Sequence, residues 1–188
     1  MDKIITKYKQ LCETPSDIFE HLPVLKQYAE RCAHITEMGV RTVVSTYAFL
    51  AAEPFELVCY DIARHPNVDE AEKLAAEAKI KMTFHEKDVL SIDIAVTDVL
   101  FIDTLHVANQ LSQELGMHSG NVRKYIIMHD TTSFWLTGEP PYNELTSSRA
   151  CGKGLRYAIE PFLENNPEWE MELKLENNNG LTVLRRVK

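Results

Sequence analysis

Cysteine is scarce in this sequence and follows no recognisable pattern. The chain has only four cysteines, which lie far apart and show neither a CxxC pair nor the spacing of a disulfide framework: Cys12, Cys32, Cys59 and Cys151. Cys59 falls inside an apolar run, where a free thiol behaves as a small hydrophobic side chain. This usage excludes a disulfide-stapled secreted domain and favours a reducing compartment, for which we take the cytoplasm.

Long apolar runs and an excess of basic charge are also missing. No stretch approaches the roughly 20 apolar residues of a membrane-spanning helix, and residues 1–8 lack the apolar core of a secretory signal. The net charge is -8, with 20 Lys and Arg against 28 Asp and Glu. This balance disfavours binding to nucleic acid or to anionic membranes. We therefore expect a small-molecule partner, and the oligomeric state stays open, a homodimer included.

What the sequence does contain is an alternation of strand and helix patterns. Strands are predicted at 35–38, 57–60, 81–85, 96–102 and 124–128, with helices between them at 46–52, 68–78 and 107–115. After a helix at 155–163, two more strands flank Asn177-Asn178-Asn179-Gly180, which is typical of a hairpin turn. The pattern predicts an α/β fold: a Rossmann-like, doubly wound, mostly parallel sheet of seven strands with a C-terminal antiparallel hairpin.

Two regions fall outside this alternation. Residues 1–33 are expected to form a helical extension ahead of a domain at 34–188, with Ser16 as N-cap of a helix whose apolar residues recur at three- and four-residue steps through Cys32. Residues 131–150 contain Gly138, Pro140 and Pro141 and have no clear period. A loop of this length in a compact domain usually covers a site or is disordered.

Acidic side chains follow all five predicted parallel strands: Glu37, Asp61, Asp88, Asp103 and Asp130. Ligands of doubly wound sheets bind beyond the carboxyl ends of the strands, so these acids are candidate binding residues. Asp61 lies 22 residues after Gly39, a spacing typical of an acid that binds ribose behind a glycine-containing turn. Each acid taken alone also has a structural interpretation, as an N-cap or turn residue.

Histidines accompany the last two acids. Asp103 with His106, and His129 with Asp130, follow neighbouring strands and would bring two carboxylates and two imidazoles to one rim. Carboxylates suit Mg²⁺ or Mn²⁺, and imidazole shifts the preference toward transition metals. Asp103, His129 and Asp130 are therefore candidate metal ligands, and Asp103 and His106 are candidate catalytic residues. The alternative is that His129 packs in the core and Asp130 caps the next turn.

Four segments resemble the class I S-adenosylmethionine (SAM)-dependent methyltransferases: Glu37-x-Gly39-Val40-Arg41-x-x-x-Ser45-Thr46, Tyr60-Asp61-Ile62, Phe101-Ile102-Asp103-x-x-His106, and Ile126-Ile127-Met128-His129-Asp130-Thr131. The similarity is greatest to the small-molecule O-methyltransferases, which include catechol O-methyltransferase and the cephalosporin-hydroxylase/rhamnosyl O-methyltransferase-like proteins. The resemblance covers roughly residues 34–186. It implies methyl transfer from SAM to an oxygen of a small hydroxylated acceptor.

The resemblance also implies a role for each matched residue. The SAM-binding residues would be, from the methionine end to the adenine, Glu37, Gly39, Ser45, Asp61, Asp88 and Val89. The metal-dependent members of the family hold Mg²⁺ or another divalent cation with acids that Asp103 and Asp130 match. His129 stands where those members often have an acid, and His106 would take the proton of the acceptor.

One position departs from the family pattern. The family usually has a second glycine four residues after the first, and here that position is Val43. A β-branched side chain there either crowds the methionine moiety or packs into the core after a shift of the turn. Crowding would favour an alternative function, a non-catalytic protein of this fold that binds a nucleoside-like ligand or a protein partner. An NAD-dependent oxidoreductase is disfavoured because G-x-G-x-x-G is absent.

Overall fold

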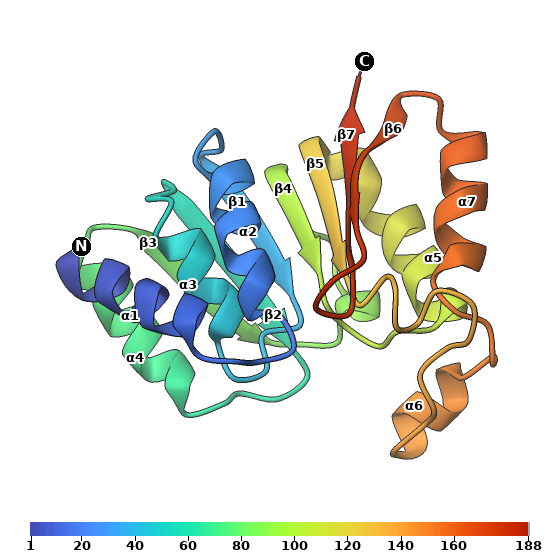
Figure 1. Ribbon diagram of the computed structural model, residues 1–188, viewed down its shortest axis with the longest axis horizontal. Helices are drawn as coiled ribbons and strands as arrows, with labels where there is room; N and C mark the ends of the chain where they lie inside the picture. Colours follow the sequence, from blue (N-terminus) through green and yellow to red (C-terminus); the bar gives the residue numbers. More distant parts are fainter. Residues whose placement is uncertain (188) are drawn as a thin grey trace.

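The computed structural model describes residues 1–187 and contains one seven-stranded sheet. Its strands lie side by side in the order β3 (Lys81–Glu86), β2 (Glu56–Asp61), β1 (His34–Met38), β4 (Thr97–Ile102), β5 (Val122–His129), β7 (Leu181–Arg186) and β6 (Trp169–Leu175) (Figure 1). The first five are parallel, and β7 and β6 run antiparallel to their neighbours. The predicted fold class is thus confirmed. The strand order reverses between β1 and β4, where such sheets open a ligand site.

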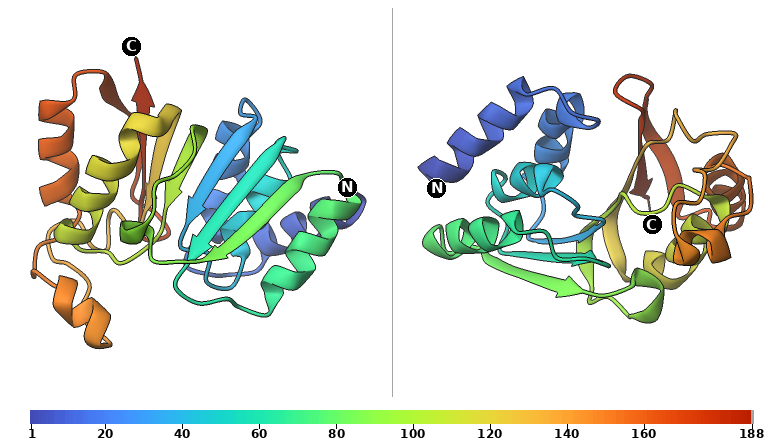
Figure 2. Two further views of the ribbon diagram at one scale, coloured as in Figure 1. Left: turned by 180° about the vertical axis from the view of Figure 1, so that it is seen from behind. Right: turned by 90° about the horizontal axis from the view of Figure 1, so that it is seen from below.

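Helices cover both faces of the sheet (Figure 2). On one face lie α1 (Asp2–Glu13), α2 (Leu22–Ala29), α3 (Val44–Leu50) and α4 (Asn67–Glu77), and on the other lie α5 (Ala108–His118) and α7 (Arg156–Asn165). Alternate residues of each central strand face opposite ways, as the pleat requires. Phe101 and Ile127 therefore pack under α2 and α3, while Leu100 and Ile126 pack under α5 and α7.

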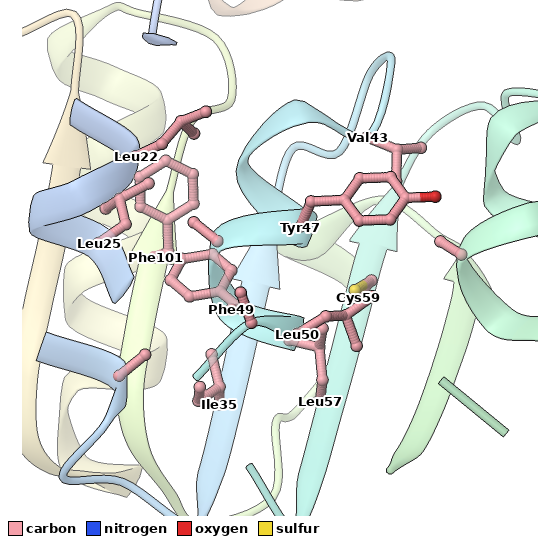
Figure 3. Close-up of a cluster of buried hydrophobic side chains, with 14 of the residues drawn as sticks. Leu22, Leu25, Ile35, Val43, Tyr47, Phe49, Leu50, Leu57, Cys59 and Phe101 are labelled. Atoms are coloured by element: carbon pink, nitrogen blue, oxygen red, sulfur yellow. The ribbon is translucent and has the colours of Figure 1, made fainter. Parts of the chain in front are cut away.

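The N-terminal segment differs in detail from its prediction. The expected helix from Ser16 is interrupted: a 3₁₀ turn at Phe19–His21 precedes α2, and Ser16 accepts only a 3.4 Å hydrogen bond from the amide of Ile18. Pro23 in the first turn of α2 suits a helix start, because its fixed φ is helical and it has no N–H to leave unpaired. Leu22 and Leu25 are fully buried in the same hydrophobic core as β1 (Figure 3). Residues 1–33 thus help to cover one face of the sheet.

The segment at 131–150 contains a short helix that the sequence pattern did not show. It is α6 (Glu144–Arg149), which begins with a capping box between Asn143 and Thr146. Figure 1 shows α6 beyond the carboxyl ends of the parallel strands. The segment is attached by an antiparallel bridge between Thr137 and Lys153.

The turn after β1 has left-handed backbone at three positions: Gly39 (φ 84°), Arg41 (φ 44°) and Val43 (φ 74°). The Val43 side chain is 1% exposed and packs in the core near Tyr47 (Figure 3). Of the two alternatives for this residue, the structure therefore has the one in which the valine packs into the core.

Among residues 1–187, no helix combines the length and apolar composition needed to cross a bilayer.

The left-handed backbone at Val43 can be tested by comparing the stabilities of its alanine and glycine variants. Valine and alanine both strain a left-handed position, by about 1–2 kcal/mol, and glycine does not. Val43→Ala and Val43→Gly both lose the burial of the valine side chain, which stabilises the fold by about 1.5–3 kcal/mol. We therefore expect Val43→Ala to be less stable than Val43→Gly in urea unfolding, with both below the unchanged protein.

Val40 is the matched control, because it is buried in the same turn without a positive φ. There glycine should be the less stable substitution, by about 0.5–1 kcal/mol relative to alanine. The same order at both positions would contradict the left-handed turn.

Candidate functional site

A cleft crosses the carboxyl edge of the parallel strands, from the end of β3 to the end of β5. Its cavity volume is about 230 Å³, and its mouth is open to solvent. Seven of the residues predicted for the site line it: Gly39, Asp61, Asp88, Val89, Asp103, His106 and Asp130. Val43 takes no part in the lining, because its side chain lies in the core.

Glu37 and Ser45 do not lie on the cleft wall, which corrects the expectation that they line the methionine end. Glu37 is fully buried and accepts hydrogen bonds from the hydroxyls of Ser45, at 2.5 Å, and Thr46, at 2.7 Å. Burial raises the pKa of Glu37 to about 7, although these hydrogen bonds oppose the rise. The pair joins the end of β1 to the first turn of α3, beneath the cleft.

Gly39 is required by the packing of the protein itself. A Cβ at this position would lie 1.9 Å from the backbone carbonyl oxygen of Asp103, far inside van der Waals contact. Only glycine lets the turn after β1 pack against the end of β4. The glycine thereby allows the end of β4, where Asp103 lines the cleft, to lie directly against the turn.

Asp61 ties the same turn to the end of β2. Its Oδ2 accepts hydrogen bonds from the amides of Val40 and Arg41, each at 2.8 Å, and its Oδ1 accepts one from Ala63 at 3.1 Å. Each carboxylate oxygen has two acceptor sites. Asp61 can therefore hold the turn and still accept a bond from a ligand in the cleft.

Asp88 and Val89 lie at the β3 end of the cleft. Asp88 caps the short turn that follows by accepting a hydrogen bond from Leu90, and it forms an ion pair with Arg149 of α6. Burial alone would raise the pKa of Asp88, but the hydrogen bonds from Arg149 and Leu90 bring the net pKa below its usual value. No motif or periodic pattern predicted Arg149 at this site.

The four residues predicted at the ends of β4 and β5 meet at the opposite end of the cleft, where Asp103, His106 and Asp130 line the wall and His129 is buried behind them. Nε2 of His106 lies 3.2 Å from Oδ1 of Asp103 and 3.2 Å from Oδ2 of Asp130. Nδ1 of His129 lies 3.3 Å from Asp103 and 3.6 Å from Asp130. The strands bring them together because β4 and β5 are adjacent and parallel, with Ile102 beside Met128.

Two further residues of this cluster come from the segment after β5. Oε2 of Glu139 lies 2.9 Å from Nδ1 of His106, and the ring of Phe134 stacks on the imidazole with centroids 5.0 Å apart. Neither residue belongs to a periodic pattern or a recognisable motif. Their role depends on how residues 131–150 fold back over the cleft.

The acids set the charge of His106. Burial lowers the pKa of its imidazole, but the hydrogen bonds to Asp103 and Glu139 outweigh burial and raise it to about 10. His106 is therefore an imidazolium at neutral pH, and its positive charge lies among three carboxylates. Burial likewise lowers the pKa of His129, and its bond to Asp103 reverses the shift to a net rise.

Asp103, His129 and Asp130 fit a divalent cation. One ligand atom from each lies within 4.8 Å of the others. Nε2 of His129 is 3.2 Å from the carbonyl oxygen of Asn178, so a proton assigned there leaves Nδ1 facing the carboxylates. Metal-binding histidines are commonly oriented in this way. The mixed oxygen and nitrogen donors suit Mn²⁺ or another transition metal, besides Mg²⁺.

Solved structures of methyltransferases share this fold over nearly the whole chain. A tomaymycin-synthesis O-methyltransferase from Streptomyces achromogenes, in complex with SAM, has a TM-score of 0.65 at 15% identity, covering 100% of this chain and 91% of its own. The 1,6-didemethyltoxoflavin-N1-methyltransferase from Burkholderia thailandensis, with S-adenosylhomocysteine bound, scores 0.64 at 12% identity, with 100% and 87% covered.

An S-adenosylhomocysteine-bound methyltransferase from Podospora anserina scores 0.56 at 16% identity, with 99% and 88% covered. No family model and no curated protein matches the sequence. The chain thus has the fold of the class I SAM-dependent methyltransferases.

The charge of His106 should make stability depend on pH. Folding raises its pKa from 6.5 to about 10, so its contribution is full below pH 6.5 and is lost as the pH rises toward 10. We expect His106→Gln to melt several degrees below the unchanged protein at pH 6 and to approach it near pH 10, since 1 kcal/mol shifts Tm by about 2–4 °C for a chain of this size.

His85→Gln is the control, because His85 is exposed on the edge strand β3. His85→Gln should therefore change Tm at pH 6 far less than His106→Gln does. A melting difference for His106→Gln that does not change with pH would show that the imidazole is not held charged.

Proposed function

We propose that the protein is a cytoplasmic SAM-dependent methyltransferase that methylates an oxygen of a small hydroxylated acceptor with the help of a divalent cation. One observation carries the proposal. A single cleft joins acids suited to a nucleoside, at the ends of β2 and β3, to a histidine–carboxylate cluster at the ends of β4 and β5.

The cofactor would lie at the β2 and β3 end and across the switch point. Asp61 would accept hydrogen bonds from the ribose hydroxyls, as acids at this strand end do in related folds. Asp88 and Val89 would flank the adenine. The sulfonium of SAM is cationic, and Asp103 and Asp130, which line the same cleft, would favour a positive charge next to them.

The acceptor would lie at the β4 and β5 end. When bound, SAM would supply an electrophilic methyl group, and a divalent cation would be held by Asp103, His129 and Asp130 and would lower the pKa of an acceptor hydroxyl. Glu139 binds Nδ1 of His106 and so leaves Nε2 as the atom that exchanges a proton at the cleft. Because its pKa is raised, His106 acts as the base only after losing a proton. Tight positioning of acceptor and methyl group supplies much of the rate.

The alternative of a non-catalytic nucleoside-binding protein rested on crowding by Val43. Because that side chain packs in the core, no observation in the structure favours the alternative.

Cofactor binding tests the first half of the proposal. We expect the protein to bind S-adenosylhomocysteine in isothermal titration, and Asp61→Ala to weaken binding by about 1–3 kcal/mol, the cost of losing hydrogen bonds to a charged group. Asp69→Ala is the control, since Asp69 is an exposed acid of α4. Melting curves separate loss of the ligand contact from loss of the turn. No binding by the unchanged protein would overturn the proposed function.

Methyl transfer tests the second half. With isotopically labelled SAM and a panel of catechols and other small hydroxylated compounds, we expect activity that EDTA abolishes and Mg²⁺ or Mn²⁺ restores. His106→Gln should lower kcat by about 10²–10⁴-fold, as for loss of a general base, while His85→Gln should not. Full activity after metal removal would contradict cation assistance and leave methyl transfer standing.

A further inference from the structure

The β3 end of the cleft is closed by an ion pair between distant parts of the chain. Arg149, the last residue of α6, donates through Nη2 to Oδ2 of Asp88, and both residues line the cleft. Their side chains are 17% and 30% exposed, so the pair is largely shielded from solvent and from its screening.

A buried chain of hydrogen bonds fixes the orientation of Arg149. Its Nη1 donates to Oε1 of Gln110 at 2.9 Å, and Nε2 of Gln110 donates to Oε1 of Glu114 at 2.7 Å. Glu114 is fully buried and also accepts from the hydroxyl of Thr104 at 2.6 Å. Because the Gln110 amide gives its NH₂ to Glu114, only its oxygen faces Arg149. The guanidinium is thus anchored on the protein side.

The ion pair offers a ligand a donor and an acceptor side by side. The two bonds of Arg149 use two of its five N–H groups. Asp88 accepts from Arg149 and Leu90, one bond on each oxygen, and each oxygen has a second acceptor site. Val89, which follows Asp88, and Leu145, four residues before Arg149 on α6, add apolar side chains to the cleft lining.

We propose that Arg149 is a specificity-determining residue, which together with Asp88 recognises the edge of the adenine base. This inference rests on the proposed function. Adenine presents an acceptor, N1, beside a donor, the 6-amino group, and so complements a guanidinium beside a carboxylate. Hypoxanthine presents N1–H and a 6-oxo group, so it would place a donor against the guanidinium and an acceptor against the carboxylate. A site that loses hydrogen bonds in this way discriminates strongly against the analogue.

The test compares S-adenosylhomocysteine with S-inosylhomocysteine by isothermal titration. We expect Arg149→Ala to raise the Kd of the adenosyl ligand about 10–100-fold, the range for losing a hydrogen bond to a charged group. The Kd of the inosyl ligand should change less than about 3-fold, so that the preference for adenine falls at least about 10-fold. Arg149→Lys, which keeps a charged donor, should restore part of the preference.

Arg156→Ala is the matched control, because Arg156 forms an exposed ion pair with Glu160 on α7. It should leave both affinities unchanged. Asp88→Asn is a second test of the preference for adenine, and it keeps Arg149 in place. The new amide can donate to the 6-oxo group, so this variant should bind the inosyl ligand more tightly than the unchanged protein does.

Each other outcome has a definite meaning. Equal weakening of both ligands by Arg149→Ala would show that Arg149 only holds α6 in place and would overturn this inference. An unchanged preference in both Arg149→Ala and Asp88→Asn would overturn it as well. If the unchanged protein binds neither ligand, the proposed function fails and this inference fails with it.

Discussion

The close packing of the turn after β1 on the end of β4 is the contact on which the cleft depends. Gly39 allows it, since any Cβ there would overlap the carbonyl of Asp103. Two acids hold the turn in place, Glu37 from beneath through the hydroxyls of α3 and Asp61 from the side through backbone amides. The acids that follow the first two strands thus support the cleft floor, and only Asp61 also faces the cleft.

The second organising feature is the balance of charge at the ends of β4 and β5. Asp103, Asp130 and Glu139 surround the imidazole of His106, and a positive charge among carboxylates this close together offsets their mutual repulsion. In the structure His106 supplies that positive charge. Burial raises the pKa of Asp130, because little water reaches its carboxylate to stabilise the negative charge. The same arrangement that stabilises an imidazolium is suited to a divalent cation, which would release protons on binding.

The segment between β5 and α7 connects the two ends of the site. Glu139 contacts His106 at one end, and Arg149 contacts Asp88 at the other. The bridge between Thr137 and Lys153 joins the two sides of the segment at its base. A single excursion of the chain therefore shapes the proposed acceptor and nucleoside subsites together, so a change in its sequence would alter both.

Local sequence patterns were sufficient to predict much of the fold of this protein. The period-2 and helical runs determined the parallel sheet and the hairpin, and parallel strands must place Asp61, Asp88, Asp103 and Asp130 at one edge. Periodicity reports which face of an element is buried, but not which distant residue meets it. Glu37 and Ser45 therefore satisfied the motif and yet turned out to face each other under the cleft.

The tertiary structure alone decided the rest. It placed Val43 in the core, at the end of a turn with three left-handed residues, and no local rule predicts that conformation for a β-branched residue. It also brought Glu139 to His106 and Arg149 to Asp88, across 33 and 61 residues of chain. A buried charge needs a hydrogen-bonded partner, and that partner can come from any part of the chain that the fold brings close. Such a pair therefore produces no periodic pattern in the sequence.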